Sequence, residues 1–299
     1  MPFSEKLSAR RGPLYMTAAA LCWSLGGLCI KFIPWSAMSI IGLRALLAAA
    51  VFAVFRKSVK LRFTRGNVLA ALCLSATTIL FVFANKLTTA AAAILLQFTA
   101  PAFIILIQFL FYRTRPKPAE LAAVSITVCG MLLFFADDLA PGALPGNLLA
   151  IASGLAFAGV FVCNKRPDTE PQDALFLGFL INSVIGLPFA FFEGAGGPFV
   201  WPSLTAWGFM LLLGVVQVGV AYVFFSMGIR RTPALLACLI TALEPVLNPV
   251  WVALATGERP GPFALAGGVV IVVTVVVYNV WAEKQAAKSP VKPGLAKTN

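Results

Sequence analysis

Ten long apolar stretches run along this chain, and short segments rich in charge, Pro and Gly separate them. A helix needs about 20 apolar residues to cross a bilayer. We therefore predict ten spanning helices, at about residues 13–33, 36–55, 66–85, 89–112, 118–136, 146–164, 174–192, 204–226, 233–255 and 262–282. The strands of a β-barrel would each show about ten alternating residues, which these unbroken runs do not. The sequence predicts an all-α integral membrane protein.

The composition agrees with this class of protein. Hydrophobic residues make up 60% of the 299 positions, charged residues make up 11%, and His is absent. A soluble domain is nearer half apolar and a quarter charged. All six cysteines lie inside apolar runs without a C-x-x-C pair, and the chain has no phosphate-binding loop for ATP. We therefore predict no catalytic residue, no metal site and no cofactor.

The positions of Lys and Arg predict the orientation, because cytoplasmic loops contain an excess of them. With the amino terminus inside, all but four of the 23 Lys and Arg residues fall on the inner side. Lys31, Lys86 and Arg259 fall on the opposite side, and Arg44 lies within a span. Both termini are expected in the cytoplasm. The net charge of +12 is explained by these loops, so the expected partner is an anionic lipid surface and not a nucleic acid.

An internal repeat divides the chain into two halves. An offset of 144 residues superposes Thr88 on Thr232 and Pro101 on Pro245, and an offset of 134 superposes Gly12 on Gly146. Five is an odd number, so the second five-helix repeat enters the membrane inverted, as in many secondary transporters. We predict a cytoplasmic segment at 1–12, the two inverted repeats at 13–136 and 146–282, and a disordered, basic cytoplasmic tail at 283–299.

Several motifs resemble those of a known family. These are the 5+5 arrangement, the "RP" pairs after helices four and nine, the first helix "ALCWSLGGLCIKF" and the "EP" of helix nine. Together they are similar to the drug/metabolite transporter superfamily, its EamA family and, within it, YddG-type amino-acid exporters. The resemblance implies a bacterial inner-membrane exporter with a central cavity lined by helices one to four and six to nine. It also implies that helices five and ten serve as scaffold or homodimer contacts.

Glu244 is the only charged residue between Pro233 and Ala255. On a helix it would share one face with Thr241, Asn248 and Trp251, because these four residues are spaced three, four and three positions apart. The nearby prolines have no N–H to donate and break the helical hydrogen-bond ladder, which is tolerated at membrane depth where the backbone lines a cavity.

Two interpretations of Glu244 remain open. It contacts substrate or relays a proton, or it forms a structural ion pair with Arg44, the only base deep in a span. Arg44 has the same two interpretations, substrate recognition or structure.

The other candidates are polar or aromatic residues in or near the spans. Trp23 and Trp251 are interpreted as stacking surfaces, with packing or interfacial anchoring as the alternative. For the polar residues at span ends, the alternative to lining a cavity is that they cap a helix end in contact with solvent. The remaining cavity candidates are Asn85, Gln97, Asn164 and Tyr222, with Asn182 and Gln217 also noted; the kink or gating candidates are Gly26, Gly27, Pro101, Pro245 and Pro249.

A secondary transporter best explains the inverted repeat, the interior polar residues and the missing ATP motif. We expect export of a small metabolite by alternating access, with amino acids as the first substrate class because of the resemblance. The alternatives are export of lipophilic cationic drugs or of other metabolites, or a channel. A channel would need a ring of charges or a carbonyl filter, which Glu244 alone does not provide.

Overall fold

The computed structural model describes residues 3–26, 29, 32–58, 60–88, 90–136, 144–193, 203–256 and 261–288. These residues form helices and connecting segments, and none of them forms a strand. Seven helices are long and apolar enough to cross a membrane, and shorter apolar helices lie at Pro118–Phe134 and Ala234–Leu247. The described chain is thus an all-helical, multi-pass membrane protein, as predicted, while the number of ten spans stays a prediction.

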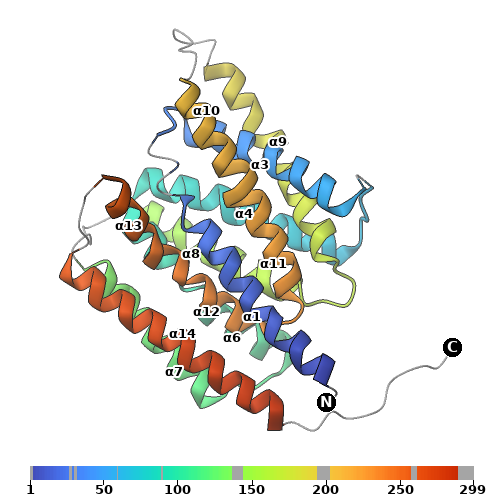
Figure 1. The fold of residues 1–299 in the computed structure, drawn as a ribbon, viewed down its shortest axis with the longest axis vertical. Coiled ribbons are helices and arrows are strands. Elements are labelled where there is room, and N and C mark those ends of the chain that lie inside the picture. The colour runs from blue at the N-terminus through green and yellow to red at the C-terminus, as the bar shows by residue number, and fades with distance from the viewer. Residues whose placement is uncertain are drawn as a thin grey trace, which may run out of the picture.

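The helices follow the apolar stretches of the sequence (Figure 1). The first half contains α1 (Phe3–Trp23), α3 (Ala37–Arg56), α4 (Arg65–Leu87), α5 (Ala90–Gln97), α6 (Ala100–Tyr112) and α7 (Pro118–Phe134). The second half contains α8 (Leu144–Cys163), α9 (Pro171–Glu193), α10 (Leu204–Leu211), the π-helix η1 (Leu212–Val220), α11 (Ala221–Ile229), α12 (Ala234–Thr241), α13 (Leu243–Thr256) and α14 (Pro262–Lys288).

The two ends of the chain are more helical than the sequence indicated. α1 begins at Phe3, within the predicted terminal segment 1–12, and α14 continues to Lys288, within the tail predicted as disordered. Residues such as Ala, Glu, Lys and Gln after position 281 favour helix, so the helix continues past the apolar run. The rest of the tail lies outside the described residues.

Helix breaks occur at matching places in the two halves. α5 and α6 are separated at Phe98 and Thr99, and α12 and α13 are separated at Ala242. Pro101 and Pro245, which the repeat superposes, each lie in the first turn of the helix after the break. Proline is tolerated in a first turn because its missing N–H would have no helical partner there. Each break therefore falls just before a proline.

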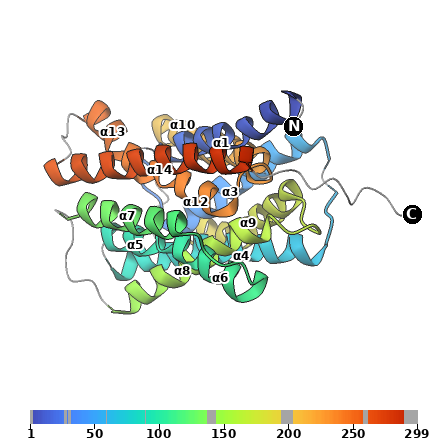
Figure 2. The same cartoon turned by 90° about the horizontal axis from the view of Figure 1, so that it is seen from below.

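Glycines allow helices from opposite halves to cross closely. A Cβ placed on Gly42 of α3 would lie 2.4 Å from the carbonyl carbon of Gly186 of α9. A Cβ on Gly267 of α14 would lie 2.5 Å from the carbonyl oxygen of Gly130 of α7. Such small residues let membrane helices approach each other. α7 and α14 thereby lie side by side at one edge of the molecule (Figures 1 and 2).

The first helix of each half packs against the other half. α1 contacts α11 and α12, and α8 contacts α4, α5 and α6. A Cβ on Gly12 of α1 would lie 2.7 Å from Oγ1 of Thr232, and one on Gly146 of α8 would lie 2.7 Å from the backbone nitrogen of Thr88. The repeat superposes these two glycines and these two threonines, so the two contacts are equivalent.

Candidate functional site

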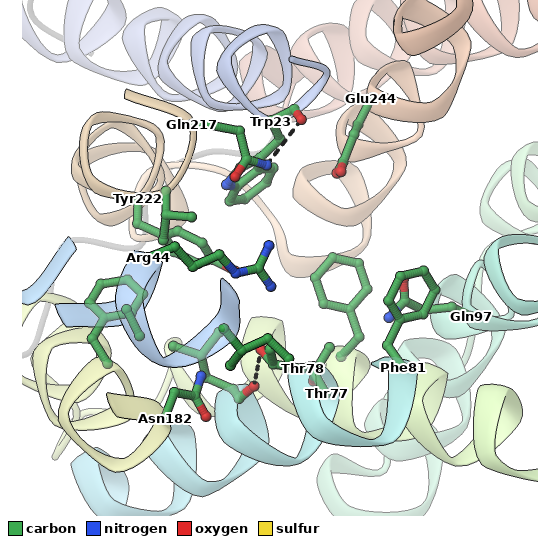
Figure 3. A pocket seen from close by; sticks show the side chains of 16 residues that line it. Trp23, Arg44, Thr77, Thr78, Phe81, Gln97, Asn182, Gln217, Tyr222 and Glu244 are labelled. Atoms are coloured by element: carbon green, nitrogen blue, oxygen red, sulfur yellow. Dashed lines mark hydrogen bonds between the residues drawn. The ribbon is translucent and has the colours of Figure 1, made fainter. Parts of the chain in front are cut away.

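A cavity of about 170 Å³ lies inside the helix bundle. Its walls come from α1, α3, α4, α5, α8, α9, η1, α11 and α13 (Figure 3). Gln97 is the last residue of α5, and Glu244 lies two residues after the break at Ala242, so both helix breaks adjoin the cavity. The polar side chains that line it are Arg44, Thr77, Thr78, Gln97, Asn182, Gln217, Tyr222 and Glu244.

The cavity lies near the middle of the predicted membrane. Arg44 is twelve residues before Arg56 at the end of α3, and Thr77 is twelve residues after Arg65 at the start of α4. A helix rises about 1.5 Å per residue, so the cavity is about 18 Å from the level of these terminal arginines. The hydrocarbon core is about 30 Å thick. Polar groups at this depth need either a partner or water.

Arg44 and Glu244 project into the cavity from opposite walls (Figure 3). Within the part of the chain that the structure describes, neither side chain forms an ion pair or a hydrogen bond. The direct structural pair considered from the sequence is therefore not formed in this conformation. Intramembrane charges either pair or face a water-filled space. Both charges here are available to a molecule in the cavity.

Three neutral polar atoms of cavity-lining residues also have no hydrogen-bond partner among the residues that the structure describes. They are the indole Nε1 of Trp23, Oδ1 of Asn182 and Oε1 of Gln217, all buried. A buried polar atom without a hydrogen bond costs about 1–3 kcal/mol. The cavity wall thus combines the charged groups of Arg44 and Glu244 with residues that have an unsatisfied polar atom.

Aromatic rings form the apolar part of the wall. The rings of Trp23 and Tyr222 meet edge to face, with centroids 4.9 Å apart, and Phe179 meets Tyr222 in the same way at 5.3 Å. Phe81 and Phe157 also line the cavity. This wall can hold an apolar or aromatic group beside the charged groups.

The segments predicted to be cytoplasmic form a second charged region, here named the basic face: residues 56–67, 165–173 and 230–231. Arg56 and Asp173 form an ion pair whose side chains are only 6% and 8% exposed. Arg230 pairs with Glu170 at 3.4 Å and donates to the carbonyl of Thr169. These bonds join the ends of α3 and α11 to the start of α9.

Asp168 joins the basic face to α4. Its Oδ2 accepts a hydrogen bond from the backbone N–H of Gly66 at 2.9 Å, and its Oδ1 accepts one from Nε of Arg166 at 3.0 Å. The bond from Arg166, aided by the backbone donors of Asp168 and Gly66, holds the pKa of this carboxyl below its usual value. Asp168 is therefore ionised at neutral pH.

Five predicted cavity residues meet at the cavity: Trp23, Arg44, Gln97, Tyr222 and Glu244. Pro101 and Pro245 follow the helix breaks, and Gly26 adjoins Gln217. Gly27 lies outside the described residues, and Asn85, Asn248 and Pro249 lie in helices whose side chains there are not described.

Three predicted cavity residues lie away from its walls. Oγ1 of Thr241 donates to the carbonyl of Cys238 at 2.6 Å, and Nδ2 of Asn164 donates to that of Val160 at 2.7 Å. Nε1 of Trp251 donates to Oγ of Ser24 at 2.7 Å. The break at Ala242 separates Thr241 from the helix that carries Glu244, so the single helical face expected for these residues is interrupted.

Sequence reasoning missed several wall residues of α4, α8 and α9. Thr77 and Thr78 stand as an adjacent polar pair in an apolar run, which was the available signal. Their hydroxyls donate to the carbonyls of Cys73 and Leu74 on their own helix, a common way to place threonine in a membrane helix. Phe81, Phe157 and Phe179 gave no signal, because apolar rings are expected throughout such helices.

Comparisons with known proteins agree on one family. The EamA-like transporter family model matches residues 10–136 and again residues 144–280. The transporter YetK of Bacillus subtilis, whose function is uncharacterized, is 26% identical over 89% of this chain and 84% of its own length. The aromatic amino acid exporter YddG of Ancylobacter novellus is 26% identical over 63% of this chain and 67% of its own.

Two further comparisons extend over most of the chain. The pseudopaline exporter CntI of Pseudomonas aeruginosa is 26% identical over 82% of this chain and 83% of its own length. One solved crystal structure superposes with a TM-score of 0.77 and 21% identity, covering 93% of this chain and 99% of that one. This last likeness concerns the fold alone.

Proposed function

Because the chain belongs to the EamA-like transporter family, we propose that it exports amino acids or similar small metabolites across the bacterial inner membrane by alternating access. The observation that carries the proposal is the cavity near mid-membrane, where Arg44 and Glu244 project from opposite walls without an ion pair to any described residue. The family and its relatives named above are transporters. The cavity is the substrate site of this transporter.

The proposed architecture is ten spans in two inverted repeats, 13–136 and 146–282. The equivalent contacts of Gly12 with Thr232 and of Gly146 with Thr88 support it. The matching helix breaks before Pro101 and Pro245 support it as well. Two similar halves can exchange conformations, which opens a central site to each side in turn. In this scheme the basic face is cytoplasmic, as are both termini, and its ion pairs break when the cavity opens inward.

The substrate class follows from the groups left unsatisfied. The carboxylate of an amino acid fits Arg44, and its ammonium fits Glu244 on the opposite wall, with the amides of Asn182 and Gln217 as further hydrogen-bonding groups. The volume of about 170 Å³ is below the roughly 300–1,000 Å³ of pockets for drug-sized ligands. A quaternary ammonium drug has no N–H for these acceptors and would face the charge of Arg44. The family relationship to an aromatic amino acid exporter supports the same class.

α7 and α14 complete the proposal as scaffold helices. They pack on each other through Gly130 and Gly267 and border the cavity at no point. Their outer faces expose apolar side chains such as Leu121, Val273 and Val277, which suit lipid or a second copy of the chain.

The test is counterflow in proteoliposomes. Purified protein is reconstituted into proteoliposomes that are loaded with unlabelled substrate. Uptake is then assayed with a panel of radiolabelled L-amino acids and one labelled quaternary ammonium dye. We expect saturable, substrate-accelerated uptake of at least one amino acid and none of the dye. Uptake of the dye alone would replace the amino-acid class by the drug class. Uptake that neither saturates nor accelerates would indicate a channel and contradict alternating access.

A further inference from the structure

Gln217 lies where the cavity meets the end of α1. It belongs to the π-helix η1, a rare conformation that occurs frequently at functional sites. Its side chain is only 7% exposed, and its Nε2 donates a hydrogen bond to the carbonyl oxygen of Trp23 at 3.1 Å (Figure 3). Gln217 lines the cavity, and its other amide atom, Oε1, is buried without a hydrogen-bond partner among the described residues. The N–H side of this amide is therefore hydrogen-bonded, whereas its oxygen has no described partner.

The amide N–H of Gln217 bonds the last residue of α1. Trp23 is the last residue of α1, and helix ends leave carbonyls without intrahelical partners. Gly26 lies against the same amide, since a Cβ there would be 2.9 Å from Nε2 of Gln217. Ser24 accepts a hydrogen bond from Nε1 of Trp251 at 2.7 Å. Two side chains of the second half therefore hold the segment Trp23–Gly26 of the first.

We propose that Gln217 is a positioning residue that couples occupancy of the cavity to the end of α1. The inference rests on the cavity being the substrate site, as proposed above. A substrate N–H that binds Oε1 fixes the planar amide and polarises it, so its N–H bonds the Trp23 carbonyl more strongly. An empty cavity leaves the amide freer to rotate, and the segment Trp23–Gly26 is then held less firmly.

Asn182 provides the matched control. It is also buried, it also lines the cavity, and its Oδ1 is also unpartnered. Asn182 belongs to α9, and its side chain forms no described hydrogen bond to α1. It contacts substrate in the proposed site but does not hold the end of α1, so the two residues separate substrate contact from coupling.

The experiment is hydrogen–deuterium exchange with mass spectrometry on the full-length protein in nanodiscs. The peptide covering Ser24–Cys29 is followed with and without saturating L-phenylalanine, and a peptide covering Leu121–Cys129 of α7, which contributes no residue to the cavity wall, serves as internal reference. The variants are Gln217→Met, which keeps the size but neither donates nor accepts, and Asn182→Leu. Gly26→Ala is a second variant that displaces the amide without changing it, should Gln217→Met not fold.

We expect Gln217→Met and Gly26→Ala to speed exchange of the Ser24–Cys29 peptide about fivefold without substrate, as expected for loss of one hydrogen bond. Asn182→Leu should leave that exchange unchanged. Saturating L-phenylalanine should slow it in wild type and in Asn182→Leu, but not in Gln217→Met. The reference peptide should not change in any variant.

Two outcomes would overturn the coupling role. One is equal exchange of the Ser24–Cys29 peptide in substrate-free wild type and Gln217→Met. The other is equal protection by L-phenylalanine in Gln217→Met and wild type. Failure of wild type to bind L-phenylalanine would instead count against the proposed substrate, and the substrate-free comparison would then decide the role of Gln217.

Discussion

In the cavity, Arg44 and Glu244 project from opposite walls and form no ion pair with a described residue, whereas at the basic face Arg56 and Asp173 form a buried ion pair. Buried charges are costly in both places. At the basic face the cost is offset within the protein, by a bond that joins α3 to α9. In the cavity neither charge forms an ion pair or a hydrogen bond within the described part of the chain, which leaves both charged groups for a molecule that enters. The difference separates charges that hold a conformation from charges that bind a substrate.

The largest expected effect is on stability at the basic face. Asp173→Ala leaves the buried guanidinium of Arg56 without its partner, which typically costs about 3–5 kcal/mol. Glu170→Ala is the control, because its pair with Arg230 is 41% and 49% exposed and such pairs contribute about 0–1 kcal/mol. Thermal melting in detergent should show a large fall in Tm for Asp173→Ala only. Equal Tm changes for the two variants would remove the structural role given to the buried pair.

Glu244→Gln should have the largest effect on transport and little on folding. A hydrogen bond to a charged group contributes about 1.5–3 kcal/mol, so loss of the carboxylate should lower L-phenylalanine counterflow by roughly 10- to 100-fold. The Tm should stay near that of wild type, because Glu244 has no partner to lose among the described residues. Hydrocinnamate, which lacks the ammonium, should inhibit both proteins equally. Wild-type transport by Glu244→Gln from about pH 5.5 to 8 would return this residue to a packing role.

Arg44→Gln should produce the complementary defect. Its counterflow should fall by about tenfold or more, since a hydrogen bond to a charged group contributes about 1.5–3 kcal/mol. Phenethylamine, which lacks the carboxylate, should inhibit wild type and Arg44→Gln equally. A structural pair predicts a different result: equal losses of folded protein in both single variants and partial recovery in the double variant with exchanged charges. Recovery of that kind would show that the two charges do pair in another state.

The sequence predicted the helices better than the cavity. Helices and kinks depend on apolar runs and prolines, which are local features of the sequence. The helices and the irregularities near Pro101 and Pro245 were therefore predictable. Glu244 and Arg44 stood out because charge inside an apolar run is rare. Thr241 did not reach the cavity walls, since the break at Ala242 interrupts the helical periodicity that grouped it with Glu244. Trp251 lies on α13 together with Glu244, but its Nε1 donates to Oγ of Ser24. Helical spacing cannot show where one helix ends and the next begins.

The role of Gln217 depended on contacts that sequence does not carry. Its significance arises from the π-helix and from the end of α1, which lies 194 residues away in the chain. No local pattern distinguishes this Gln from Gln97, whose Nε2 donates to Oγ of Ser153 at 2.8 Å. Both were visible as polar residues in apolar runs. Only packing decides which of their amide atoms is left free.

The smallest expected effect concerns Asp168, an exposed charge of the basic face. Its pKa in the folded protein lies below the ordinary value of 3.8, mainly through the hydrogen bond from Arg166. A carboxyl with a lowered pKa adds stability that is fully present above its unfolded pKa and disappears as the pH falls through its folded pKa. Asp168→Asn should therefore lower the Tm slightly, because exposed pairs contribute little. The Tm difference from wild type should be constant between about pH 7 and 5 and should shrink only below about pH 4. A difference that already shrinks between pH 7 and 5 would mean that this carboxyl titrates at a higher pH than its hydrogen bonds predict. The charges of the basic face would then stabilise the folded protein less than the contrast with the cavity implies.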